Sequence, residues 1–216
     1  KRHKANKIID DELVCITSFY QQEKNNKLKQ LTLLEATEYG WWYTAQLPDN
    51  RCAIALTCDK SFSQYFKINK HNNWLKLLKH STKNVCQSLI KSEYIENSMR
   101  INLASSYVLD KIVGQNWLTT GDAACAFDPI SAGGIYKALT HGISAAKTIS
   151  QYFKGESLAL ENYANMIESD FQHYLSNKIF LYQQERRWQK SPFWIRRHAY
   201  KKSDGLAHLQ TADFTL

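Results

Sequence analysis

Residues 121–134 combine a carboxylate with flexible backbone in a way that suits a polyhydroxyl, electron-rich ligand. Gly121 and Asp122 follow a short apolar run, and an aspartate at a strand end can accept hydrogen bonds from hydroxyl groups. Gly133 and Gly134 stand where a helix is expected to begin, so a ligand can approach the backbone closely there. The free amides and positive dipole end of that helix would face the electron-rich part of the ligand.

The residues between these two pairs predict a loop that leads into the helix. Asp128 precedes Pro129, and a residue before proline is driven out of the helical region. Ser131 is a candidate helix cap. We predict a buried strand over 117–120 and a helix from the glycines to about Phe153.

The sequence predicts neither a catalytic triad nor a metal site. Its seven histidines lack HxxxH or HExxH spacing, and its five cysteines form no CxxC or Cys/His pattern. The cysteines are odd in number and scattered, which indicates reduced thiols and a cytoplasmic location. We therefore assign no catalytic side chain and no metal ligand.

Composition predicts a soluble globular protein. The chain has 216 residues, 44% hydrophobic residues and a mean hydropathy of −0.49, and no apolar run approaches the roughly 20 residues that span a bilayer. The net charge of +8 suits an anionic cofactor, an acidic partner or nucleic acid equally well, so charge alone does not choose between them.

Alternating, β-branched runs around one clear turn predict an antiparallel sheet. We expect strands over 13–20, 31–37, 41–47 and 51–58, with a Pro-Asp-Asn turn before the last of them. Period-two alternation places Trp41 on the core face of the third strand, and Trp42 and Thr44 on a face that could bear a ligand. The alternative is that both tryptophans pack against helices.

The rest of the chain is expected to be largely helical, apart from a β-type run over 100–108. We predict helices over 72–80, after Ser81, and from 156 to about 188, where the last is amphipathic and ends before Pro192. The tail over 185–197 mixes arginine with aromatic residues. It fits either a nucleic-acid or membrane contact, or a helix end whose aromatics anchor on the core while the arginines face water.

The stretch from Gly121 to Gly134 resembles the second flavin-binding motif of FAD-dependent aromatic hydroxylases and flavin-dependent halogenases. The family pattern is a strand, Gly-Asp-Ala-Ala, a spacer, Asp-Pro, a serine and a glycine that opens a helix. The resemblance implies that Asp122 bonds the ribityl or ribose hydroxyls of FAD, while the helix amides lie near the flavin pyrimidine edge. It makes these residues candidates for binding FAD: Gly121, Asp122, Asp128, Pro129, Ser131, Gly133 and Gly134.

The resemblance extends over most of the chain. Residues 35–49 look like the substrate-sheet hairpin of these flavoproteins, and the tail is similar to that of a subgroup that oxidises a tryptophan side chain of a partner protein during tryptophylquinone maturation. The implied fold is α+β, with an antiparallel substrate-binding sheet and helices over 1–110, a remnant of a Rossmann-like FAD domain over 111–153 and a C-terminal helical segment over 154–216.

One departure from the family is the absence of GxGxxG, the motif that binds the ADP half of FAD. We therefore expect the chain to be the C-terminal part of a flavoprotein, to need an N-terminal FAD-binding segment as a partner, and to be inactive alone.

The implied activity is hydroxylation of an electron-rich aromatic ring through a flavin C4a-hydroperoxide, with a tryptophan of a partner protein as the candidate substrate. Two alternatives stay open at this point, a flavin-dependent halogenase and a non-catalytic basic interaction module.

Overall fold

The structure is a computed structural model that describes residues 4–23 and 32–199, and its contacts divide the chain into two compact units. The motif unit contains, of the described residues, 4–11, 104–184 and 198–199. The sheet unit contains 12–23, 32–103 and 185–197. The two units interleave along the sequence, whereas contiguous segments were expected, and each unit is described by itself.

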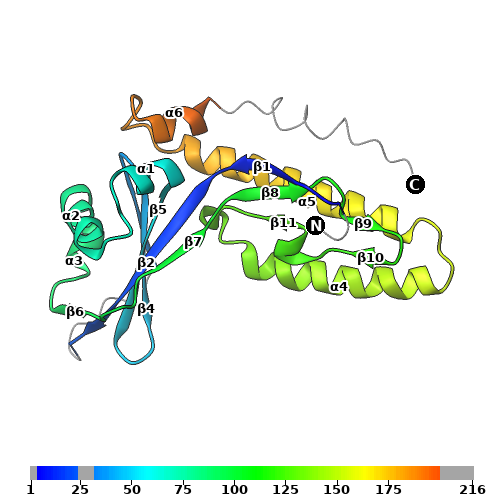
Figure 1. The fold of residues 1–216 in the computed structure, drawn as a ribbon, viewed down its shortest axis with the longest axis horizontal. Helices are drawn as coiled ribbons and strands as arrows, with labels where there is room; N and C mark the ends of the chain where they lie inside the picture. Colours follow the sequence, from blue (N-terminus) through cyan, green and yellow to red (C-terminus); the bar gives the residue numbers. More distant parts are fainter. Residues whose placement is uncertain (1–3, 24–31, 200–216) are drawn as a thin grey trace. The chain divides into compact units, whose positions relative to one another are not determined.

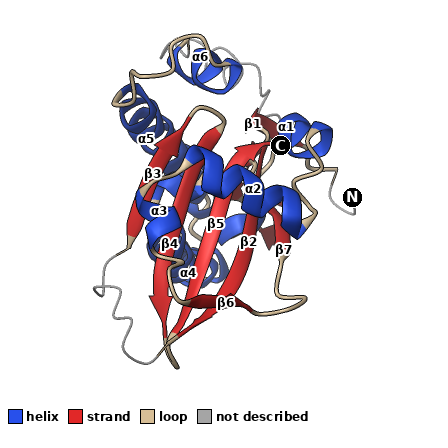
Figure 2. Cartoon of the chain, turned by 90° about the vertical axis from the view of Figure 1, so that its left-hand side faces the viewer, coloured by secondary structure: helices blue, strands red, loops and turns tan. Residues whose placement is uncertain are grey.

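The sheet unit is built on an antiparallel sheet with the strand order β3-β4-β5-β2-β6, and β7 also pairs with β2 (Figure 2). Its strands are β2 (Leu13–Gln22), β3 (Leu33–Thr37), β4 (Gly40–Leu47), β5 (Arg51–Asp59), β6 (Ser92–Tyr94) and β7 (Arg100–Leu103). The strands and hairpin expected between 13 and 58 are confirmed in the described part of that range, because their alternating apolar residues need one buried face.

Three helices of the sheet unit follow β5 and precede β6. They are α1 (Lys60–Tyr65), α2 (His71–Ser81) and α3 (Asn84–Gln87), and α2 and α3 lie across one face of the sheet (Figure 2). Trp74 and Leu78 of α2 and Val85 of α3 are fully buried against apolar side chains of β2, β4 and β5. The helix predicted over 72–80 is thus confirmed, whereas the one after Ser81 is a single turn.

The face of β4 that was expected to bear a ligand is buried, while Trp41 on the expected core face is buried as well, at 3% exposure. Trp42 is 0% exposed and meets Trp74 edge-on, with ring centroids 5.1 Å apart. Thr44 is 2% exposed. Both side chains lie on the face that the helices cover, so the expected ligand-bearing face is wrong and the alternative of packing against helices holds for Trp42. The reason is tertiary, because alternation shows that a strand has two faces but not which one the helices will cover.

The tail over 185–197 packs within the sheet unit and includes most of α6 (Pro192–His198). The Trp194 indole donates a 2.8 Å hydrogen bond to the Thr37 carbonyl oxygen. Arg197 is 4% exposed and its Nη2 lies 3.0 Å from Asp59 Oδ1. Aromatic anchoring is therefore confirmed, whereas the expectation that the arginines face water is wrong for Arg197.

The motif unit combines a small antiparallel sheet, β1-β8-β11, with two long helices (Figure 1). Its elements are β1 (Lys7–Asp11), β8 (Ser106–Leu109), β9 (Val113–Gly114), β10 (Trp117–Leu118), β11 (Cys125–Ala126), α4 (Gly134–Phe153) and α5 (Ala159–Gln183). Tyr163, Ile167 and Phe171 of α5 are buried in a core with α4 and β8.

Several boundaries in this unit differ from the sequence predictions. The run expected over 100–108 is split between β7 of the sheet unit and β8. The strand expected over 117–120 is the two-residue, half-buried β10, paired with β9. The helix predicted to begin at the two glycines is α4, and it ends at Phe153 as predicted. The expected α+β class is confirmed. Within residues 4–23 and 32–199, no helix is long and apolar enough to cross a membrane.

Candidate functional site

The glycine-aspartate pair forms a single tight turn in the motif unit. A 3-10 helix, η1 (Gly121–Ala123), follows β10. Gly121 has φ +57°, a left-handed conformation that glycine adopts without the steric cost of a Cβ. A Cβ built on Gly121 would lie 4.0 Å from the Ala138 Cα, so the turn lies against the start of α4. The turn thereby holds the Asp122 residue beside α4.

The Asp122 carboxylate is exposed to solvent but fixed at one oxygen. Its side chain is 82% exposed, and Oδ1 accepts a 2.7 Å hydrogen bond from the Lys137 ammonium. Among the described residues no protein donor is recorded for Oδ2. One oxygen is thus anchored by the protein, and the other can accept hydrogen bonds from hydroxyl groups of a ligand.

The first turn of α4 presents amides for which no acceptor is recorded among the described residues, whereas the Gly133 amide just before them donates to the Ser131 hydroxyl at 3.4 Å. The N-cap, Gly133, makes no side-chain cap hydrogen bond, and the first amide bonded back to it is that of Lys137. The preceding helical amides therefore lack intrahelical acceptors. No heavy atom outside the helix lies within 4 Å of a Cβ built on Gly134, so its backbone is open to a ligand.

Asp128 has a different role from the one expected. It is 0% exposed: Oδ1 accepts from the Ile130 amide at 3.0 Å and Oδ2 accepts from the Tyr182 hydroxyl at 2.7 Å. Its own amide donates to the Tyr174 hydroxyl at 2.9 Å. Burial raises the pKa of this carboxyl. Direct contact of its side chain with FAD is not supported, because every recorded bond is to the protein and no part is exposed.

Pro129 and Ser131 bound a second 3-10 turn, η2 (Pro129–Ser131), for which Asp128 is the cap. Pro129 is exposed at the first helical position, where a missing amide hydrogen is tolerated. The Ser131 hydroxyl donates a 2.9 Å hydrogen bond to the Asp128 carbonyl oxygen. These contacts show that Pro129 and Ser131 help to fix the conformation of the loop. Contact of either residue with a cofactor stays a prediction.

Lys137 was not recognised from the sequence. It is 3% exposed, and besides Asp122 its Nζ donates to the Cys125 carbonyl oxygen and lies 4.2 Å from the centre of the Phe127 ring. The sequence did contain a signal for Lys137. A cation in the first turn of a helix opposes the helix dipole, so it needs a specific partner.

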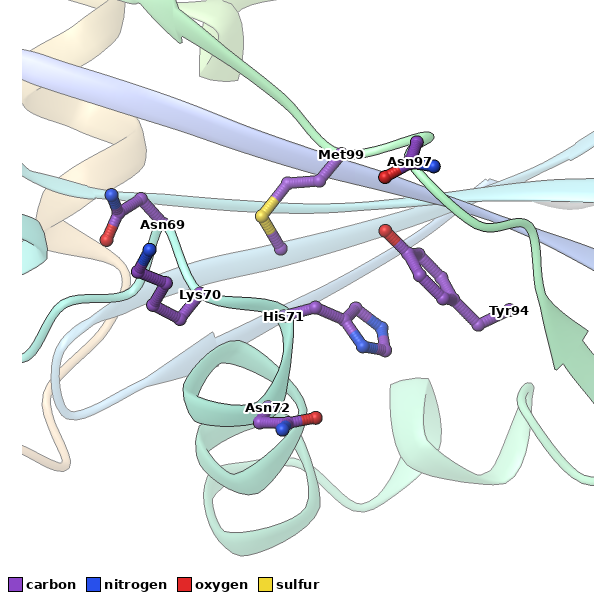
Figure 3. A pocket seen from close by; sticks show the side chains of 7 residues that line it. All are labelled: Asn69, Lys70, His71, Asn72, Tyr94, Asn97 and Met99. Carbon is purple, nitrogen blue, oxygen red and sulfur yellow. The ribbon is translucent and has the colours of Figure 1, made fainter.

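The sheet unit carries a pocket of about 430 Å³ that the sequence did not predict (Figure 3). The His71 and Tyr94 rings stack there with centroids 3.6 Å apart, and the His71 imidazole lies 3.0 Å from the Tyr20 hydroxyl. Burial lowers the pKa of His71. The pocket is lined by Asn69, Lys70, His71, Asn72, Tyr94, Asn97 and Met99. No residue of the expected FAD motif is among them.

Comparison with known proteins agrees with the motif. No protein-family model matches the chain. A protein of Marinomonas mediterranea named as an FAD-dependent oxidoreductase, LodB, is 28% identical over 193 residues, which cover 89% of this chain and 51% of LodB. The chain is thus similar in sequence to an FAD-dependent oxidoreductase over most of its length. The resemblance inferred from the sequence is confirmed, and the similarity supports FAD as the cofactor.

Solved structures of flavin-dependent enzymes share this fold. The myxobacterial chondrochloren halogenase CndH matches with a TM-score of 0.81 and 16% identity over 94% of this chain and 49% of CndH. The peptidyl tryptophan dihydroxylase QhpG, essential for tryptophylquinone cofactor biogenesis, matches with a TM-score of 0.72 and 22% identity over 89% of this chain and 44% of QhpG. The chain spans about half the length of these relatives.

The residues of the motif unit fit FAD. The free oxygen of Asp122 suits a sugar-like hydroxyl, and the unused amides of α4 suit an electron-rich ring edge. The open space at Gly134 permits close approach of a ligand to these amides. No group of three or more histidine, cysteine, aspartate or glutamate side chains in the described ranges is arranged to hold a metal ion.

Proposed function

We propose that this chain acts within a flavin-dependent monooxygenase that hydroxylates an electron-rich aromatic ring, with a tryptophan side chain of a partner protein as the substrate. The observation that carries the proposal is the exposed Asp122 carboxylate beside the open N-terminus of α4. The sequence relationship to LodB and the fold shared with QhpG, a peptidyl tryptophan dihydroxylase, support the reaction class and the substrate.

In this proposal the motif unit binds FAD, which supplies the redox and oxygen chemistry when bound. Oδ2 of Asp122 accepts hydrogen bonds from cofactor hydroxyls. The amides of Gly134 and Ile135 would stabilise negative charge on the electron-rich ring of bound FAD, as preorganised dipoles do at low cost in reorganisation. Ser131 and Pro129 shape the loop in front of these amides.

The sheet unit supplies the surface for the aromatic substrate. The face of the sheet opposite α2 carries Tyr43 of β4 opposite Ala55 of β5, and Ala53 of β5 opposite Phe19 of β2. Tyr43 and Phe19 are half-buried. Aromatic rings pack favourably in stacked or edge-on geometry, so these two side chains can contact an aromatic substrate. This face therefore replaces Trp42 and Thr44 as the proposed substrate surface.

The apolar face of α4 supports association with an FAD-binding segment. Ile135, Leu139 and Ile143 recur at helical spacing and are 82%, 64% and 71% exposed. A stripe of large exposed apolar side chains marks an interaction surface. In the proposal a dinucleotide-binding segment covers this stripe and completes the flavin site.

A matched pair of glycines on α4 tests the cofactor site. Neither Gly134 nor Gly142 has an atom outside the helix within 4 Å of its built Cβ, so Gly134→Ala and Gly142→Ala should both fold. With the N-terminal FAD-binding segment present, we expect Gly134→Ala to weaken FAD binding by about tenfold, because its Cβ would occupy the ligand's space, and Gly142→Ala to bind FAD as the parent does. Equal FAD affinities of the two variants would contradict the assignment.

Product analysis distinguishes hydroxylation from halogenation, the second candidate. A flavin-dependent halogenase of Armillaria mellea, armH3, is 32% identical over 84 residues, 38% of this chain and 17% of armH3. The FAD-loaded protein is given a reductant, oxygen, chloride and a tryptophan-bearing peptide, and the peptide is weighed by mass spectrometry. We expect the addition of one or two oxygen atoms. Replacement of hydrogen by chlorine would overturn hydroxylation in favour of halogenation.

A further inference from the structure

Lys137 is a buried cation whose contacts join three segments of the motif unit. Its side chain extends from α4 to the Asp122 carboxylate of η1, at 2.7 Å, and to the Cys125 carbonyl oxygen of β11. The ammonium also lies 4.2 Å from the centre of the Phe127 ring. Only 3% of the residue is exposed, so Lys137 is held among protein groups.

This placement is costly unless the contacts compensate for it. Burial removes the hydration of an ammonium, and a position in the first turns of a helix opposes the helix dipole. A carboxylate, a carbonyl oxygen and an aromatic face are the groups that offset such a cost. Lys137 meets one of each.

The direction of the side chain explains how Lys137 reaches Asp122. Helical side chains slant toward the helix N-terminus, so Lys137 extends back past the turns that begin at Gly134. The ion pair is asymmetric, because the lysine is buried while the Asp122 side chain is 82% exposed. A buried cation thus holds one oxygen of an exposed carboxylate and leaves the other oxygen facing outward.

We propose that Lys137 is a positioning residue for the cofactor site. It anchors Oδ1 of Asp122, directs Oδ2 toward the ligand hydroxyls, and ties η1 to the N-terminus of α4 so that the carboxylate and the helix amides act on one ligand. The role toward FAD rests on the proposed function, whereas the clamp between Lys137 and Asp122 is a property of the chain itself.

FAD affinity tests whether Lys137 acts through Asp122. With the N-terminal FAD-binding segment present, we expect Lys137→Met to weaken FAD binding by about tenfold and Lys137→Arg, which keeps the charge, to restore most of the affinity. In a double-mutant cycle, adding K137M to Asp122→Asn should cost less than about twofold more, because the anchored group is already altered. Lys147→Met, at an exposed position of the same helix, should bind FAD as the parent does. Additive losses, or unchanged affinity in K137M, would overturn the proposal.

Amide hydrogen exchange without flavin tests the clamp separately. Asp122 is exposed, so Asp122→Asn should fold even if K137M does not. We expect exchange over Gly121–Cys125 to become about tenfold faster in D122N and in K137M, and to change little in K147M. Unchanged exchange in D122N would overturn the clamp. Faster exchange in the variants, together with no FAD binding by the parent even when the N-terminal FAD-binding segment is present, would keep the clamp and reject the proposed function.

Discussion

The Tyr182 hydroxyl donates a 2.7 Å hydrogen bond to Oδ2 of Asp128, a carboxyl with no solvent exposure. The bond connects the end of α5 to the loop that leads into the N-terminus of α4. Tyr174, from the same helix, accepts a 2.9 Å hydrogen bond from the Asp128 amide. Two tyrosines on one helix therefore hold the position of the Asp-Pro loop.

Tyr182→Phe should destabilise the chain by about 1–3 kcal/mol, because the buried carboxyl loses a donor that water cannot replace. Urea unfolding followed by circular dichroism measures the loss. Tyr136→Phe is the matched control, since Tyr136 is 74% exposed and its variant should stay within about 0.5 kcal/mol of the parent. Equal stability of the two variants would show that the Tyr182 bond contributes nothing.

Gly121→Ala should cost about 1–2 kcal/mol of stability, because φ is +57° there and a Cβ is disfavoured in the left-handed region. Gly142→Ala should instead stabilise α4 by about 0.5–1 kcal/mol, since Gly142 lies inside the helix and its built Cβ meets no atom within 4 Å. Thermal unfolding measures the change in stability of both variants. A neutral Gly121→Ala would refute the need for glycine at the turn.

His141 should make the chain less stable as the pH falls below 6.5, the ordinary pKa of histidine. Burial lowers the pKa of His141 from 6.5, against the opposing effect of Asp170, whose Oδ2 lies 3.2 Å from Nε2. Nearby Lys137 also lowers this pKa. The unfolded chain therefore takes up the proton first, so stability is intact above 6.5 and is lost as the pH falls from 6.5 through the lower folded value.

Urea unfolding between about pH 5 and 8 checks this dependence. His141→Gln should make the fall in stability shallower, because glutamine stays neutral over the whole range, while His71, whose pKa is also lowered by burial, keeps its own share. His173→Gln, at an exposed position on α5, should retain the fall of the parent. If the stability of His141→Gln depends on pH as steeply as that of the parent, His141 is not the source of the pH dependence.

Tyr43→Ala should impair use of the aromatic substrate without impairing FAD binding, because Tyr43 lies on the sheet face opposite α2, which we propose as the substrate surface. We expect KM to rise by about tenfold, the size that loss of one aromatic contact of about 1.4 kcal/mol produces. Tyr65→Ala is the control, since Tyr65 is 81% exposed on α1. Steady-state kinetics with the tryptophan-bearing peptide separates KM from kcat, and identical kinetics for both variants would exclude this face.

Features that depend on neighbouring residues were predictable from the sequence. Strand alternation and the Pro-Asp-Asn turn located β4 and β5, because a period of two and a tight turn are local properties. The glycines and Pro129 likewise predicted a turn, a loop and the start of α4 at Gly134. The flavin motif could be recognised in the same way, since its carboxylate and backbone groups lie within one short stretch.

The tertiary structure alone decided which of these groups are available to a ligand. Trp42 and Asp128 became buried, one beneath α2 and the other beneath α5, whereas Asp122 stayed exposed. Lys137 gained its partners only when α4 packed against η1 and β11. The physical reason is that burial and long-range ion pairing depend on which surfaces meet, and local sequence period carries no information about the partner surface.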